Sequence, residues 1–159
     1  MTEREDIIEP ESGLLRLQDY FPYQLAVASN QVSRMVARHY QSRLGLTLWE
    51  WRVIAVLAEG RPISAQLLSE AAAMDKVTVS RTVKVLLDQE LISRRRNETD
   101  RRSSLLSLTD KGQETYEKVA PLALKAEKAL LEGEDEAELK RLVDLLNRLK
   151  TKAGSIDLE

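Results

Sequence analysis

The sequence predicts a mainly α-helical fold built around a winged helix-turn-helix, with a two-stranded β-wing and further helices on both sides. Apolar residues recur at spacings of three and four along much of the chain, which is the period of amphipathic helices. Two short helical patterns, 65–72 and 75–89, are separated only by Ala73 and Met74, the geometry of a helix-turn-helix. An arginine-rich segment with the pattern of a β-hairpin follows at about 93–108.

The helices before this unit have clear boundaries. The first opens around 22–24 and ends near Gly45, which can take the left-handed conformation that closes helices. Thr47 and Glu50 form a capping-box pattern, in which each side chain satisfies the exposed backbone N–H of the other residue. This pattern predicts the start of a second helix. Ser64 is the expected N-cap of the third, short helix.

The second helix of the helix-turn-helix is amphipathic, and Asp75 is its expected N-cap. Val79, Val83 and Leu86 lie on its apolar face. An α-helix fits the major groove of DNA, and its first turns present side chains to the base edges. The polar residues that we take as candidates for this reading face are Lys76, Thr78, Ser80, Arg81 and Lys84.

The hairpin is predicted from alternation and from its arginines. Leu106 and Leu108 alternate with Ser107, which is the period of a half-buried strand. Arginines at the base and tip of a hairpin suit contacts with phosphates and with a narrow minor groove. The alternative is a solvated face of a basic hairpin. The candidate wing arginines are Arg94, Arg95, Arg96, Arg101 and Arg102.

The net charge of −2 is unusual for a nucleic-acid-binding chain, but the charges are unevenly distributed. Residues 1–12 carry five acids and one arginine, and we expect them to be a flexible acidic tail. Within 74–111, nine basic side chains stand against six acidic ones, a local net charge of +3. A local basic patch of this kind is what phosphate contacts require. Residues 52–115 contain no aromatic side chain on which a base could stack, which favours duplex DNA over single strands.

Composition excludes several classes of function. The chain has no cysteine, so disulfides, thiolate metal sites and thiol-based sensing are excluded, and His39 is the only histidine. No nucleophile–base pair, phosphate-binding loop or metal-ligand spacing is visible, so we expect neither an enzyme nor a bound cofactor or metal. No segment approaches the roughly 18 apolar residues of a membrane span. We therefore expect a cytoplasmic protein without membrane contact.

The last third of the chain predicts two further helices. Thr109 and Asp110 cap the first, and Gly133 separates it from the second. The second carries a continuous apolar stripe, formed by Leu139, Leu142, Val143, Leu146 and Leu149. Such a stripe is too apolar to face water, so it predicts a homodimer; an ordinary intramolecular core is the alternative.

Several motifs together resemble the core of the MarR family of winged-helix transcriptional regulators. The upstream segment from Gly45 to Val53 is similar to the entry into the family's second helix, and the resemblance extends over roughly 20–152. One departure is Glu90, where the family usually has glycine, which puts the local helix end in question. The matching motifs are Val79-Ser80-Arg81, Leu91-Ile92, Asp100-Arg101-Arg102 and Leu108-Thr109-Asp110-Lys111-Gly112.

The resemblance implies roles for individual residues and for whole segments. In the family, the wing arginine, here Arg102, enters the minor groove, and the aspartate, here Asp100, orients it. The first and last helices form an obligate homodimer, which requires a pseudopalindromic operator. The implied regions are a dimerisation helix region at 13–45, a DNA-binding domain at 46–112, dimerisation helices at 113–152 and a tail at 153–159.

Family members commonly change their DNA affinity when a small aromatic acid or an aromatic acyl-CoA binds between the dimer helices and the DNA-binding lobe. Six of the seven aromatic residues lie within the first 51 positions and could line such a pocket, with arginines to meet a carboxylate. The alternative is that Trp51 is core and the other aromatic residues pack in an interface. The candidate effector-pocket residues are Arg38, Tyr40, Arg43, Trp49 and Arg52.

These observations lead to one main functional prediction. We expect a ligand-responsive transcriptional repressor that binds duplex DNA as a homodimer and is released by an aromatic effector. The alternative is a winged-helix module for protein interaction or assembly without specific DNA binding, which would not need arginines at the tip of its wing.

Overall fold

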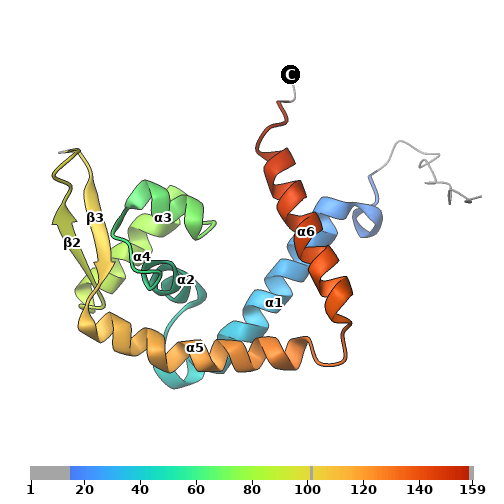
Figure 1. The fold of residues 1–159 in the computed structure, drawn as a ribbon, viewed down its shortest axis with the longest axis horizontal. Helices are drawn as coiled ribbons and strands as arrows, with labels where there is room; N and C mark the ends of the chain where they lie inside the picture. The colour runs from blue at the N-terminus through green and yellow to red at the C-terminus, as the bar shows by residue number, and fades with distance from the viewer. Residues whose placement is uncertain (1–14, 101, 158–159) are drawn as a thin grey trace, which may run out of the picture.

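The computed structural model describes residues 15–157 except residue 101, so residues 1–12 and Arg101 lie outside the described part. The predicted helix-turn-helix followed by a hairpin is confirmed within a mainly helical fold (Figure 1). The elements in chain order are η1 (Leu17–Asp19), α1 (Phe21–Leu44), α2 (Leu48–Leu57), β1 (Ile63–Ser64), α3 (Ala65–Ala71), α4 (Lys76–Asp88), β2 (Ile92–Arg96), β3 (Ser104–Leu108), α5 (Asp110–Leu130) and α6 (Glu136–Ala153).

Most of these helices begin where the sequence predicts, because their first residues carry local capping signals. The capping box of Thr47 and Glu50 is complete, with both side chain to backbone hydrogen bonds present. Ser64, Asp75 and Thr109 each accept a hydrogen bond from a backbone N–H three residues later, at the starts of α3, α4 and α5. Each cap satisfies one of the N–H groups that a helix leaves free at its start.

Helices α2, α3 and α4 and a small sheet form one lobe, on the left in Figure 1. The strands are antiparallel in the order β1-β3-β2, and the β2–β3 hairpin is the predicted wing. Strand β1 was not predicted, and it pairs Ile63 with Leu106 and Ser64 with Leu105. Because β1 has only two residues, it is too short to carry the alternation by which strands are predicted.

The core of this lobe is contributed by every one of its larger elements. Ile54 of α2, Leu68 of α3, Leu86 of α4, Ile92 of β2 and Leu106 of β3 are all fully buried. Burial of side chains of this size is worth about 1.5–3 kcal/mol each. The core therefore determines the orientation of α4: its apolar face points inward, and its polar face is left on the outside.

Two turns of the lobe use the left-handed backbone conformation at residues other than glycine. Ala73, between α3 and α4, has φ 51°, and Glu90, between α4 and β2, has φ 59°. This conformation costs a non-glycine residue about 1–3 kcal/mol. The end of α4 at Glu90 therefore has the left-handed conformation that glycine would adopt at lower cost. Leu91 N–H donates to the carbonyl of Leu86 at 2.9 Å and closes the end of α4.

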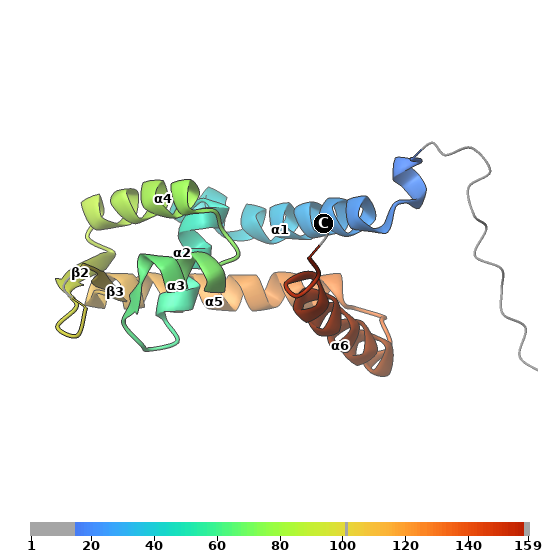
Figure 2. The same ribbon diagram turned by 90° about the horizontal axis from the view of Figure 1, so that it is seen from above.

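Three long helices extend away from the lobe. Helix α5 leaves β3 and packs along α1, and α6 turns away after Gly133 (Figure 1). Figure 2 shows the wing at one end of the molecule and α6 at the other. No residue of α6 is buried, and the exposed fractions of Leu142 and Val143 are 51% and 54%. The apolar stripe of α6 is therefore uncovered within a single chain.

Candidate nucleic-acid interface

Helix α4 presents its polar residues on the side opposite the core. Val79, Val83 and Leu86 are buried. Lys76, Ser80, Arg81 and Lys84 are exposed, as expected for a reading face. Val77 is also 58% exposed in the first turn of α4, and the sequence analysis did not select it. An exposed apolar side chain at this place can contact the methyl group of thymine. The sequence signal that could have identified Val77 is its position outside the apolar stripe of α4.

Thr78 differs from the other residues of the reading face, because it is half-buried and bound to the helix cap. Its N–H donates to Asp75 Oδ1 at 2.9 Å and its hydroxyl donates to Asp75 Oδ2 at 2.5 Å. These hydrogen bonds hold the pKa of the Asp75 carboxyl below its ordinary value. The cap is therefore retained above the ordinary pKa of aspartate and is lost as the pH falls through the lowered pKa.

The turn of the wing is organised by its own polar residues. Asn97 N–H donates to the carbonyl of Ser103 at 3.2 Å, and Asn97 Nδ2 donates to Ser103 Oγ at 3.0 Å. The carboxylate of Asp100 accepts the backbone N–H of Arg102 at 3.0 Å. Of the described ion pairs, none joins the Asp100 carboxylate to the Arg102 guanidinium. Asp100 thus holds the backbone at Arg102, and the exposed side chain is left available.

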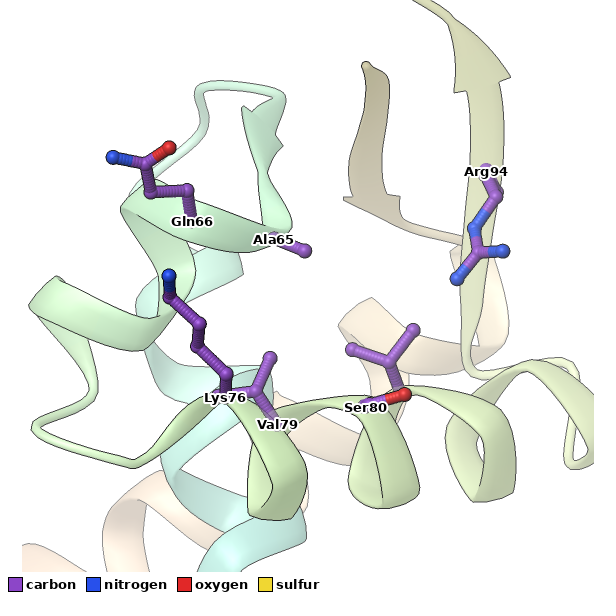
Figure 3. A pocket seen from close by; sticks show the side chains of 7 residues that line it. Ala65, Gln66, Lys76, Val79, Ser80 and Arg94 are labelled. Carbon is purple, nitrogen blue, oxygen red and sulfur yellow. The ribbon is translucent and has the colours of Figure 1, made fainter. Parts of the chain in front are cut away.

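The pleat of β2 separates the three arginines at the base of the wing. Arg94 pairs with the buried Leu106, and therefore lies on the same face of the sheet as the core residue Ile92. Arg96 shares that face, while Arg95 lies on the opposite one. Arg94 thus comes next to α4, where it lines one groove with Lys76 and Ser80 (Figure 3) and another with Arg81 and Lys84.

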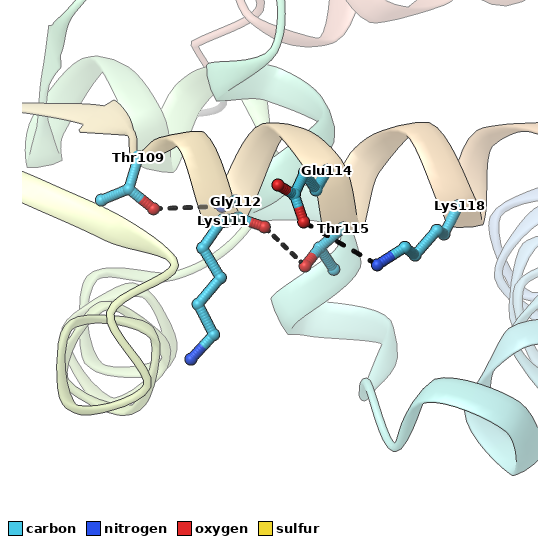
Figure 4. A network of polar contacts seen from close by, with 6 residues as sticks. All are labelled: Thr109, Lys111, Gly112, Glu114, Thr115 and Lys118. Atoms are coloured by element: carbon cyan, nitrogen blue, oxygen red, sulfur yellow. Dashed lines mark hydrogen bonds and ion pairs between the residues drawn. The ribbon is translucent and has the colours of Figure 1, made fainter.

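The end of α4 is attached to the start of α5 through Leu91. The Leu91 carbonyl accepts the N–H of Thr109 at 3.1 Å, and the Thr109 hydroxyl donates to the neighbouring carbonyl of Glu90 at 2.7 Å. The same hydroxyl caps α5 by accepting the N–H of Gly112 at 3.0 Å (Figure 4). Lys111 Nζ donates to the carbonyl of Gln89 at 2.8 Å. The Leu108 to Gly112 motif therefore fixes the position of α4 relative to α5.

The five candidate effector-pocket residues are only partly brought together. Arg38 and Arg43 are exposed on α1, whereas Tyr40 is fully buried. The Arg52 guanidinium lies 5.3 Å from the centroid of the Trp49 ring, and its Nη2 donates to Ser33 Oγ of α1 at 3.3 Å. None of the five cavities described for residues 15–157 is lined by any of these candidates.

An aromatic stack occupies the junction of α1, α2 and α5. The ring centroids of Tyr40 and Trp51 are 5.7 Å apart, and those of Trp51 and Tyr116 are also 5.7 Å apart. Tyr116 is the one aromatic residue outside the first 51 positions, and its distance along the chain hid this contact from sequence reasoning. The Tyr40 hydroxyl is buried and has no hydrogen-bond partner among the described residues.

Replacing Tyr40 by phenylalanine is expected to raise the free energy of unfolding by about 1 kcal/mol at pH 7, because a buried polar group without a partner is removed. Burial also raises the pKa of Tyr40 to about 12, opposed by the nearby charge of Arg52. The unfolded chain ionises this group near pH 10. The contribution of this raised pKa to the free energy of unfolding is therefore fully present below about pH 10, and it is lost as the pH rises toward 12.

Urea denaturation of the wild type and Tyr40→Phe at pH 7 and pH 11 measures both effects. The variant is expected to lose less stability at pH 11 than the wild type does. Tyr23→Phe, at an exposed position of α1, is the control and should change neither value. A variant less stable than the wild type at pH 7 would contradict the assignment of an unpartnered hydroxyl.

Other site classes find no support in the described residues. Within residues 15–157, omitting 101, no helix is long and apolar enough to cross a bilayer. The same part of the chain contains no group of three histidine, cysteine or carboxylate side chains placed to hold a metal ion.

Comparison with known proteins agrees with this geometry. Residues 44–103 match the model of the MarR family. A MarR/EmrR family transcriptional regulator from Acinetobacter sp. ADP1 is 32% identical and has a TM-score of 0.81, covering 89% of this chain and all of that one. The regulator BilQ of Clostridium symbiosum is 39% identical over 94 residues, which are 58% of this chain and 65% of its own length. BpsR of Bordetella bronchiseptica shares the fold, with 23% identity, a TM-score of 0.76 and coverage of 91% and 100%.

The helix-turn-helix, the arginine wing and the flanking helices define a winged-helix DNA-binding protein. More specifically, the chain belongs to the MarR family of transcriptional regulators. This is a family of regulators and not of enzymes.

Proposed function

We propose that this regulator is a repressor that binds a pseudopalindromic duplex operator as a homodimer and is released by an aromatic effector. The observation that carries the DNA-binding part is the exposed polar face of α4 together with the exposed Arg102 of the wing. In this proposal, Lys76, Ser80, Arg81 and Lys84 enter the major groove, and Arg102 enters the adjacent minor groove.

A homodimer is supported by the uncovered apolar surface of the long helices. Leu142, Val143 and Leu146 of α6 are exposed, and so are Phe21 and Leu25 of α1. Exposed apolar surface of this extent marks an interaction site. A second copy is the proposed occupant, because two-fold symmetry presents two reading helices to inverted half-sites about one helical turn apart.

The aromatic effector is supported by fold neighbours and by the residues at the junction of α1 and α2. DNA binding by BpsR is regulated by 6-hydroxynicotinic acid, which is an aromatic acid. In this chain, Trp49 is 42% exposed beside Arg52, and Arg38 and Arg43 are exposed cations on α1. A screen of aromatic acids and their CoA thioesters for thermal stabilisation and for DNA release tests this part. The absence of any compound with both effects would contradict it.

Selection from a random-sequence duplex library tests the operator. The expected result is an enriched sequence with inverted half-sites, bound more tightly than unselected duplexes. If no sequence is enriched and the protein has no affinity for any duplex, the result would favour the protein-interaction module. Repression is then tested with the selected operator placed within a promoter, where the protein is expected to lower transcription in vitro; raised transcription would contradict a repressor.

Replacing Arg102 by alanine is expected to weaken operator binding by about 1–3 kcal/mol, because the proposed minor-groove cation is lost. Fluorescence anisotropy with the selected operator at moderate salt measures the change. Arg141→Ala removes the same charge on α6, at the other end of the molecule, and should have little effect. Unchanged affinity for Arg102→Ala, with the fold intact by circular dichroism, would contradict the role of the wing.

A further inference from the structure

A groove opens between the short helix α3, the reading helix α4 and strand β2 of the wing. Its volume is about 320 Å³, and Figure 3 shows the side chains around it. Val79 and Val83 of α4 form an apolar floor. Four polar side chains surround this floor and come from all three elements: Gln66, Lys76, Ser80 and Arg94.

The chemistry of the groove favours an anion. Lys76 and Arg94 are cations, and Gln66 and Ser80 can donate hydrogen bonds from their amide and hydroxyl groups. No acidic residue lines the groove. In the described part of the chain, none of these four side chains makes an ion pair or a hydrogen bond. Four unused donor groups around one small space can therefore be used by a ligand that accepts hydrogen bonds.

The position of the groove indicates which anion it holds. The groove lies between α4, proposed for the major groove, and the wing, proposed for the adjacent minor groove. In duplex DNA, a major groove and the neighbouring minor groove are separated by one sugar–phosphate backbone. A protein that occupies both must place this backbone against the surface between its two reading elements.

We propose that this groove binds a backbone phosphate of the DNA, held by Arg94, Lys76 and Gln66. The proposal rests on the proposed DNA-binding function and refines it. Lys76 moves from the residues proposed for the major groove to the residues that position the duplex, whereas Arg81 and Lys84 remain candidates for base reading. It brings together Lys76 of the reading helix and Arg94 of the wing in one site. It also adds Gln66 of α3, which the sequence analysis did not select.

The test compares Arg94→Ala with Arg95→Ala. Both variants remove one arginine from an exposed position of β2, but only Arg94 lines the groove, because Arg95 lies on the opposite face of the sheet. A phosphate contact is independent of sequence, so a labelled duplex of arbitrary sequence serves as the probe, with the selected operator beside it. Fluorescence anisotropy over a range of salt concentrations measures affinity and its salt dependence.

Arg94→Ala is expected to weaken binding to both duplexes by the same factor, about tenfold or more. It should also reduce the slope of log affinity against log salt by about one per protomer. Arg95→Ala should change both quantities much less. Gln66→Ala is expected to weaken both duplexes by about tenfold with an unchanged slope, because it removes a hydrogen bond without removing a charge.

Equal losses for Arg94→Ala and Arg95→Ala would overturn the proposal, since a diffuse positive field would then explain both. A loss on the operator alone would also overturn it, because Arg94 would then be reading bases. If inorganic phosphate stabilised the wild type but not Arg94→Ala, and both arginine variants bound DNA equally, the groove would bind free anions and the proposal would fail. A wild type that binds no duplex would refute the DNA-binding function itself, which is a separate result.

Discussion

Replacing Gly112 by alanine is expected to lower the free energy of unfolding by about 3 kcal/mol or more. A Cβ atom at this position would overlap the carbonyl oxygen of Leu91 and would lie 3.0 Å from its carbonyl carbon and 3.1 Å from Leu108 Cδ2. The first two contacts are with backbone, which cannot move away like the end of a flexible side chain. The Leu91 carbonyl is also held by a hydrogen bond from the N–H of Thr109.

The variant must therefore separate the start of α5 from the end of α4. This junction connects the long helices to the reading helix, so DNA affinity is expected to fall together with stability. Thermal and urea denaturation measure the first effect, and anisotropy with the selected operator measures the second. Thr109→Ala is a milder second test that leaves the protein folded for a binding assay. It keeps the backbone hydrogen bond to the Leu91 carbonyl but loses the cap of α5 and the hydroxyl's hydrogen bond to the Glu90 carbonyl.

Gly154→Ala is the matched control for this prediction. Gly154 follows α6 with a φ of −75°, and an added Cβ would come no closer than 3.6 Å to another atom. The same chemical change should therefore leave stability almost unaltered. If Gly112→Ala and Gly154→Ala unfolded at the same denaturant concentration, the close approach of α5 to Leu91 would not hold in solution.

Replacing Leu142 by glutamate is expected to dissociate the proposed homodimer, raising its dissociation constant at least about 100-fold. Leu142 lies in the apolar stripe of α6 and is 51% exposed in the single chain. In a dimer that covers this stripe, the glutamate would be a buried charge without a partner. Operator affinity should fall as well, because one protomer contacts only one half-site.

Sedimentation equilibrium of the wild type and the variant measures the association. Thr151→Glu adds the same negative charge to α6 nine residues away, which is two and a half turns and therefore the opposite side of the helix, and it should leave the dimer intact. A variant that remained dimeric would contradict the assignment of the α6 stripe to the interface. A wild type that is monomeric at micromolar concentration would contradict the homodimer itself.

Much of the secondary structure was predictable because its signals lie within a few residues of one another. The capping box of Thr47 and Glu50 and the caps at Asp75 and Thr109 act over three residues, and all of them are present. The buried face of α4 followed from the helical period of Val79 and Val83 in the same way. The family resemblance rested on motifs of this local kind.

Near neighbours along the chain set where most helices begin, which face of α4 is polar and where the basic charges gather, so these properties could be predicted from the sequence. By contrast, the packing of distant segments stacks Tyr116 on Trp51, brings Gly112 against the Leu91 carbonyl and joins β1 to the sheet. It likewise turned the Arg94 face of β2 toward the core and α4, and brought Arg94 to one groove with Gln66 and Lys76. These contacts join segments that are far apart in the sequence, and neither periodicity nor capping patterns indicate such contacts. They therefore form only when packing of the core fixes the elements against one another.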